Sequence, residues 1–560
     1  MIKVFERDGK KKIVIYTGIT GILLCFFFLY SFLAFQETAL QPIKFNSPDE
    51  TANYYFSKIF AERTEIGYSE PLLKDTKGLL HPRSMAASSD GGRVVSAGFL
   101  GIVFLYGVLG KFFSSGAIPF FTPVIAVVSS VFFYFLLTEF FSKRVALLSS
   151  LLLLIHPAYW YYSNRGMFPN VLFLDLLIGG LFFLWRAFHF RTNLIFFISG
   201  FFVGLALIVR LSELPWVLFL LLFIWMCTIR RFRVRGTCFF LFGITIPLVI
   251  LFWCNQQVYG NMFFSGYTQI GTHLSAGAMQ TNGMQWWQNI YFSVKFVLKS
   301  FLNTLFPFGF VFVEFKKNFL TYFVSLFWWF TVPAVVGIGS LLFHVVRQIR
   351  HHIYSKELGY LCVFFATSLW LIPFYGSWAV MDTITGEATI GNSYVRYWLP
   401  LYCFIIPLSA YGICYVYDHI RSFFGKKSIA VVLFFIFVFF SYQSVFSQKT
   451  DGLISVAKHI QEYRDISLRV TNATEEGAVI FSNRSDKIFF PQRHSAQSFN
   501  GFGEVEIIPS LLKKAPVYYY GFEDQVAGAE ISEKYFSPFG LRLEHISDIA
   551  GVESLYRVVR

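Results

Sequence analysis

Charged side chains are scarce in this sequence of 560 residues: Asp, Glu, Lys and Arg together make up 14% of it, whereas a soluble domain usually contains about 25%. Hydrophobic residues make up 55% and aromatic residues 20%. This composition excludes an ordinary soluble domain and favours a lipid bilayer as the solvent. Several apolar runs approach or exceed the roughly 20 residues that cross a bilayer core, among them Ile13–Phe35, Ala117–Leu137, Val145–Tyr162 and Ile429–Phe440.

Cysteine is also scarce, and it is missing from the polar segments. All seven cysteines lie in or beside hydrophobic runs: Cys25, Cys227, Cys238, Cys254, Cys362, Cys403 and Cys414. This distribution excludes a disulfide framework, and the spacing does not match a zinc site. The N-terminus resembles a signal peptide because Lys10–Lys12 precede an apolar run. That run is too long for a signal peptide and no small-residue cleavage site follows it, so we expect an uncleaved membrane anchor.

The basic residues indicate the topology. They account for a formal charge of +14 and cluster in short loops between apolar runs, which is typical of orientation charges and not of a nucleic-acid site. We therefore expect an α-helical polytopic membrane protein of the plasma membrane or cell envelope, with a cytoplasmic N-terminus, an outer C-terminus and no nucleic-acid partner. The expected spans, about eleven by the usual length, are 13–35, 117–138, 145–162, 168–185, 193–209, 214–229, 236–254, 321–345, 358–375, 396–415 and 428–445.

Two further apolar stretches complicate the span count. Val94–Phe113 contains glycines at 98, 101 and 107, among others, and is followed by a polar connector, and Tyr291–Val313 carries Lys295 and Lys299 on one helical face. Both are better interpreted as helices that lie in the membrane interface. If only one of them crossed the membrane, every later basic loop would move to the outer side.

The sequence divides into a transmembrane domain over 1–447 and an extracytoplasmic domain over 448–560. The transmembrane domain includes a hydrophilic first outer loop, about 36–116. In the tail, Leu453–Tyr463 has helical periodicity, and short apolar runs predict strands near 478–482 and 517–520. A hairpin near 541–559 would complete a small α/β domain.

An acidic pair stands in the first outer loop, soon after the first span. Pro48 suits the first turn of a helix, and Asp49 and Glu50 stand where the helix macrodipole stabilises negative charge. Two interpretations are open from these residues. The acids either do no more than stabilise a helix start, or they serve a site at the outer interface, where a carboxylate meets both water-borne and lipid-borne substrates.

The order of four motifs resembles that of the GT-C glycosyltransferases. The similarity is greatest to the protein O-mannosyltransferase and lipid A aminoarabinose transferase branch, or glycosyltransferase family 39. The acidic pair is the first motif, and His81-Pro82 resembles the His-Pro or Lys-Pro step of that family. His156-Pro157 with Ser163–Asn170 resembles its second outer loop, and Ser393–Pro400 resembles its late Arg-Tyr-x-x-Pro element.

The resemblance implies transfer of a hexose or pentose from a polyprenyl-phosphate donor to a protein, lipid or glycan acceptor on the extracytoplasmic face, with inversion. Asp49 would be the general base, because an acceptor hydroxyl needs a carboxylate to take its proton, and Glu50 would assist it. Arg396 and Arg165 would bind the donor phosphate, since guanidinium groups keep their charge and bond in pairs. Further substrate contacts would come from His81, Tyr54, Asn170 and Tyr397.

Several assignments stay open in the sequence. Asn170 stands where relatives often carry an acid, which argues against a metal site built from two loops and leaves a divalent metal as an open alternative. Arg396 could instead anchor the chain in the interface beside Tyr397, and Arg210 with Glu213 reads as a plain local ion pair. A transporter is the second alternative. It would need ionisable residues at mid-membrane depth and two matching halves, and this sequence has few such residues and no evident halves. A polysaccharide polymerase or ligase is a third alternative, which the acid after the first span disfavours.

Overall fold

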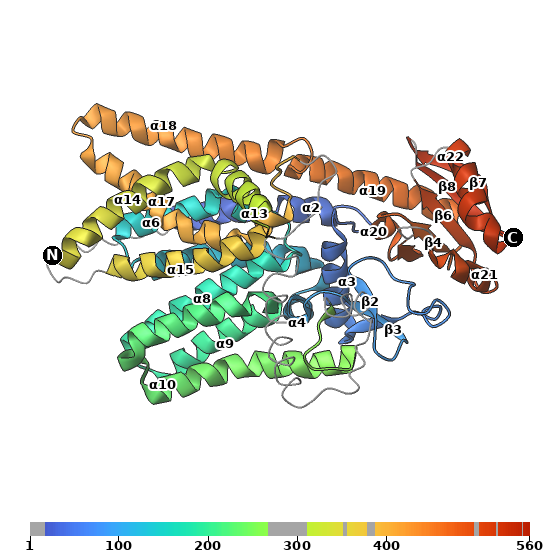
Figure 1. Cartoon of the computed structure of the whole chain (residues 1–560), viewed down its shortest axis with the longest axis horizontal. Coiled ribbons are helices and arrows are strands. Elements are labelled where there is room, and N and C mark those ends of the chain that lie inside the picture. The colour runs from blue at the N-terminus through green and yellow to red at the C-terminus, as the bar shows by residue number, and fades with distance from the viewer. Residues whose placement is uncertain are drawn as a thin grey trace, which may run out of the picture.

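The computed structural model describes residues 17–266, 311–350, 356–377, 387–497, 503–521, 525–551 and 553–560. Figure 1 shows a bundle of long helices at one end of the molecule and a small sheet domain at the other. A layer built from the first loop lies between them and includes α3 (Pro48–Arg63) and α4 (Leu100–Phe112). The expected fold class, a helical membrane protein with a C-terminal α/β domain, is confirmed.

Within the described residues, eight helices are long and apolar enough to cross a membrane, and up to ten when each of two bent pairs counts as one span. The first bent pair joins Thr17–Tyr30 to α2 (Phe32–Thr38) at 48°. The expected span at 193–209 is α9, an apolar helix of 17 residues. After the first pair, the helices of the bundle are α5 (Phe121–Leu137), α6 (Lys143–Ile155), α7 (Pro157–Asn164), α8 (Pro169–Phe190), α9 (Asn193–Val209), α10 (Leu214–Tyr259), α14 (Trp328–Arg350), α15 (Lys356–Gly376), α17 (Leu399–His419) and α18 (Phe423–Tyr442). A kink between Thr228 and Arg233 divides α10 into two of the candidate spans.

Two helix pairs of the bundle approach closely at glycines. A Cβ atom on Gly200 of α9 would lie 1.9 Å from the carbonyl oxygen of Phe240 in α10, and one on Gly337 of α14 would lie 1.9 Å from that of Leu408 in α17. Small residues let membrane helices pack backbone against backbone, where the hydrophobic effect offers little. These glycines therefore fix the α9–α10 and α14–α17 contacts.

The first loop folds into helices and a small sheet. The stretch expected to be one interface helix, Val94–Phe113, divides into the strand β3 (Arg93–Ser96) and α4. β3 pairs on both sides with β1 (Gly67–Ser69) and β2 (Met85–Ala87), all antiparallel. The expected interface helix at Tyr291–Val313 falls almost entirely outside the described residues, whose ranges leave out 267–310.

The C-terminal domain packs α19 (Leu453–Ala473) on a five-stranded sheet. The expected strands near 478–482 and 517–520 are β4 and β6, which run parallel, and the expected hairpin is β7–β8. The sheet order is β5-β4-β6-β8-β7, and its strands are β4 (Val479–Ser482), β5 (His494–Gln497), β6 (Val517–Gly521), β7 (Arg542–Ala550) and β8 (Glu553–Val559).

Two lysines, one from each part, donate hydrogen bonds between the C-terminal domain and the first loop. Lys44 of the loop donates hydrogen bonds to the Phe490 carbonyl at 2.9 Å and to Gln492 Oε1 at 2.7 Å. Lys487 of the domain donates to the Asn46 carbonyl in return. Burial lowers the pKa of both lysines from 10.5 to about 7. Lys44 is buried and Lys487 is partly buried, so these contacts lie inside the interface between the two parts.

Candidate active site

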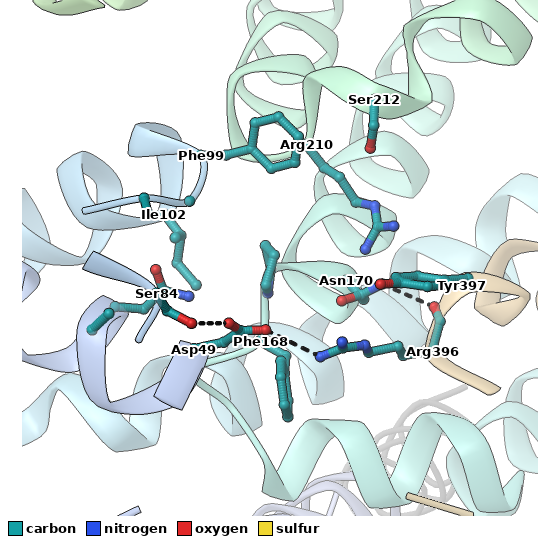
Figure 2. Close-up of a pocket in the computed structure, with 15 residues that line it drawn as sticks. Asp49, Ser84, Phe99, Ile102, Phe168, Asn170, Arg210, Ser212, Arg396 and Tyr397 are labelled. Atoms are coloured by element: carbon teal, nitrogen blue, oxygen red, sulfur yellow. Dashed lines mark hydrogen bonds and ion pairs between the residues drawn. The ribbon is translucent and has the colours of Figure 1, made fainter. Parts of the chain in front are cut away.

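A cavity of about 320 Å³ lies where the first loop meets the end of the helix bundle. Its walls come from α3, the start of α4, the start of α8, the connection between α9 and α10, and the short helix α16 (Ser393–Tyr397). Figure 2 shows polar side chains from these separate elements converging on one space. They include Asp49, Asn53, Ser84, Asn170, Arg210 and Arg396.

Asp49 is held from two sides. It is the second residue of α3, whose first turn is capped by Ser47. The Ser84 hydroxyl donates to Asp49 Oδ1 at 2.5 Å, and Arg396 Nη1 lies 3.5 Å from Asp49 Oδ2. The Asp49 side chain remains 31% exposed, and no other carboxylate in the described part of the chain lines the cavity. Asp49 is therefore fixed in orientation and open to a ligand.

Arg396 is fixed against the opposite wall. Its guanidinium donates to Ser393 Oγ at 2.8 Å and lies over the Phe168 ring, 4.5 Å from its centroid. Asn170 Nδ2 donates to the Arg396 carbonyl at 2.9 Å and so ties the start of α8 to α16. The 3.5 Å contact with Asp49 is at the outer limit of a hydrogen bond, so an incoming anion can replace it at small cost.

A second cation, Arg210, also lines the cavity. It forms the expected ion pair, with Nε 2.6 Å from Glu213 Oε1, and its guanidinium also lies 5.0 Å from the centroid of the Tyr397 ring. From the sequence, Arg210 was expected to form a local ion pair only. A charged residue placed directly at the end of an apolar helix was the one signal that it could contribute to a site.

Glu50 and Arg165 bond to each other away from the cavity. Arg165 Nε lies 2.9 Å from Glu50 Oε1, and the Arg165 and Glu50 side chains are 6% and 2% exposed. Glu50 Oε2 also accepts from the Ser47 backbone N–H at 3.1 Å. Neither Glu50 nor Arg165 is among the described residues that line the cavity. The pair instead joins the start of α3 to the end of α7, which holds the helix that carries Asp49.

Three solved structures resemble the chain in fold. ArnT from Cupriavidus metallidurans in the apo state aligns with a TM-score of 0.53 and 9% identity over 98% of both chains. The same enzyme bound to undecaprenyl phosphate gives 0.51 and 9% over 97% of both. The oligosaccharyltransferase AglB from Archaeoglobus fulgidus, in complex with an inhibitory peptide and a dolichol-phosphate, gives 0.50 and 12% over 92% of this chain and 70% of that one.

The chain has the GT-C fold. Residues 99–254 also match the family model described as dolichyl-phosphate-mannose-protein mannosyltransferase. No curated protein matches the sequence. The matched range includes the cavity residues Asn170 and Arg210, whereas Asp49 and Arg396 lie outside it.

Of the four residues predicted to contact substrate, two line the cavity and two are not among its described lining residues. Asn170 and Tyr397 line the cavity, as expected of substrate contacts. His81 and Tyr54 are not among its described lining residues. Burial lowers the pKa of His81, whose Nδ1 lies 2.9 Å from the Pro82 carbonyl, and Tyr54 packs on Phe45 with ring centroids 5.0 Å apart. Ser84, which the sequence analysis missed, lines the cavity instead.

The cavity residues do not fit a divalent cation. Within the described ranges, no three His, Cys, Asp or Glu residues lie together in a way that could hold a metal. A hard cation takes several oxygen ligands, but Asp49 is the single carboxylate on the described walls and it faces two guanidinium groups. Two fixed cations around an open space suit an anionic ligand such as a phosphate.

Proposed function

We propose that this protein is a membrane glycosyltransferase that transfers a sugar from a polyprenyl-phosphate donor to a hydroxyl of a protein, lipid or glycan acceptor. The observation that carries the proposal is the pairing, in one cavity at the end of a membrane helix bundle, of a fixed carboxylate with two fixed guanidinium groups. These are Asp49, Arg210 and Arg396.

Asp49 acts as the general base. The acceptor oxygen attacks the anomeric carbon of the donor from the face opposite to the phosphate, which inverts that centre, and its proton passes to the Asp49 carboxylate. The Ser84 hydroxyl donates to Asp49 Oδ1, whereas Asp49 Oδ2 has only the long 3.5 Å contact with Arg396 Nη1 among the described residues. Oδ2 is therefore the oxygen that takes the proton.

Arg396 and Arg210 stabilise the leaving group. As the bond between the anomeric carbon and the phosphate oxygen breaks, the electron pair remains on the lipid phosphate. Guanidinium groups held by packing can meet this growing charge without reorganising. Arg396 is fixed by Ser393 and Phe168, and Arg210 by Glu213. Arg210 thus takes the place that the sequence alone gave to Arg165.

The donor class is supported by the ligands of the structural relatives. The ArnT structure holds undecaprenyl phosphate and the AglB structure holds a dolichol-phosphate. We expect purified protein in detergent to transfer sugar from a polyprenyl-phosphate sugar to a mixed acceptor pool, and not from a nucleotide sugar. Thin-layer chromatography with radiolabelled sugar measures both reactions side by side. Transfer from a nucleotide sugar alone, with no lipid carrier present, would contradict the donor assignment.

The site is proposed to face the extracytoplasmic side, because the basic loops cluster at the opposite helix ends. Cysteines introduced at Ser69 in the first loop and at Glu476 in the C-terminal domain, both exposed, should react with an impermeant thiol reagent added to intact cells. A cysteine at Arg421, between α17 and α18, should not react. Native cysteines are replaced first, and the reverse labelling pattern would place the site on the cytoplasmic side.

A further inference from the structure

The C-terminal domain forms hydrogen bonds with two segments of the first loop. One segment precedes Asp49 in the sequence, and the other contacts the Asp49 side chain. Lys487, in the short helix α20 (Asp486–Phe489), donates to the Asn46 carbonyl just before the cap of α3. The Lys487 Nζ atom also lies 4.6 Å from the centroid of the Tyr463 ring in α19. The start of the helix that carries Asp49 is therefore tied to the C-terminal domain.

The second tie is the pair of Arg83 and Asp486. Asp486 is fully buried and accepts from the Arg83 backbone N–H at 2.7 Å and from Arg83 Nε at 2.8 Å, one bond to each carboxylate oxygen. The Arg83 guanidinium donates in addition to the Arg484 carbonyl. Because one of these bonds involves the main chain, Asp486 holds the path of the backbone as well as a side chain.

Ser84 follows Arg83 directly and bonds to Asp49. Its backbone is in the left-handed region, with φ of 61°, which a residue other than glycine adopts only where its surroundings hold it. Its carbonyl accepts from the Ala97 N–H at 3.0 Å, and its hydroxyl donates to Asp49 Oδ1 at 2.5 Å. One peptide bond thus separates the anchor on Asp486 from the hydrogen bond that orients Asp49.

We propose that Asp486 is a positioning residue for Asp49, acting through Arg83 and Ser84, so that the C-terminal domain helps to set the geometry of the active site. This inference rests on the proposed role of Asp49 as the base. The carboxylate turns about two side-chain bonds, and Ser84 restricts that rotation. Displacing a reacting group by about 1 Å can lower a rate about 100-fold, so loss of the anchor acts on the chemical step.

A matched control exists in the same interface. Asp75 of the first loop accepts from Lys514 of the C-terminal domain at 2.8 Å through both of its oxygens. This pair also joins the two parts, but within the described residues Asp75 forms no hydrogen bond with Ser84 or Asp49. Asp75→Asn therefore weakens the interface without touching the path from Asp486 to the base.

The test compares Asp486→Asn with Asp75→Asn in the purified full-length protein. For Asp486→Asn we expect kcat to fall about 10- to 100-fold, the range for a displaced reacting group, with the KM for the donor unchanged. Asp75→Asn should stay close to wild type. A thermal melt of both variants separates this effect from unfolding. Equal kcat values for the two variants, with both folded, overturn the inference.

A double-mutant cycle shows whether the effect passes through Ser84. If it does, Asp486→Asn combined with Ser84→Ala lowers kcat no further than the more severe single change, whereas independent effects multiply. Effects on kcat that multiply overturn the inference.

Hydrogen exchange gives a readout without catalysis: Asp486→Asn, and not Asp75→Asn, should speed exchange over 46–52 and 81–86. If wild-type protein transfers no sugar, the proposed function fails, and the exchange result still decides whether Asp486 holds this loop.

Discussion

Asp49→Asn is expected to lower kcat for sugar transfer by roughly 10²- to 10⁴-fold, the usual effect of removing a general base. Asn has the shape of Asp and can accept the Ser84 hydrogen bond, but it cannot take the proton of an acceptor hydroxyl. Donor binding should change little, because Arg396 and Arg210 remain in place. Initial rates at saturating donor and acceptor measure kcat, and equilibrium binding of polyprenyl phosphate measures the affinity.

The fold should survive this change, since the Asp49 side chain is 31% exposed and its contact with Arg396 is 3.5 Å long. Glu62→Gln is the matched control: Glu62 lies exposed on the same helix, and its carboxylate accepts from the Ser115 hydroxyl at 2.8 Å, away from the cavity. It should leave kcat near the wild-type value. A folded Asp49→Asn variant with near-normal turnover would remove Asp49 from the role of base.

Arg396→Ala should reduce kcat/KM for the donor about 10- to 150-fold, which corresponds to the 1.5–3 kcal/mol that a hydrogen bond to a charged group typically contributes. Arg396→Lys should lie between the wild type and Arg396→Ala, because lysine keeps the charge but loses the paired N–H geometry of guanidinium. Steady-state kinetics with varied donor concentration distinguish the three proteins. Much of the loss should appear in kcat, since charge on the phosphate grows as the bond to the sugar breaks.

Arg144→Ala provides the control for loss of one arginine. Arg144 pairs with Asp418 at the opposite end of the bundle, at 2.6 Å, and both side chains are more than half exposed. An exposed pair of this kind contributes little to stability, so kinetics should be unchanged. If Arg396→Lys kept wild-type activity while Arg396→Ala lost it, a bidentate contact with the phosphate would be contradicted; if neither lost any, Arg396 would be an interfacial anchor.

Long apolar runs in the sequence made the membrane-spanning helices predictable. An apolar run of sufficient length crosses a bilayer because each backbone polar group bonds within its own helix, so composition along the chain is enough to locate it. The bent pair of α6 and α7 was expected as one span over 145–162, and the position of the 50° bend follows from His156-Pro157. The division of Val94–Phe113 into β3 and α4 was not expected, because pairing with β1 and β2 depends on distant residues.

The helix start at Asp49 was also readable from local sequence. Ser47 with Glu50 forms a capping box, and Pro48 stands in the first turn, as such starts prefer. The structure places the two acids in different surroundings. Glu50 stabilises the helix start through the Ser47 N–H, and Asp49 lines the cavity.

Neighbouring residues alone are enough to place the chain in a membrane, to locate most of its helices and to predict an acidic helix start after the first span. Which of the two adjacent acids lines the cavity, and which arginines join it, depends on how distant segments pack. Asp49 and Glu50 differ by one step of about 100° around the helix, and Arg165 and Arg210 both stand at helix ends. Packing turns Glu50 onto Arg165 and buries both, while Arg210 lines the cavity with Asp49 and Arg396. Contacts between residues more than a hundred positions apart decide this, and no local pattern encodes them.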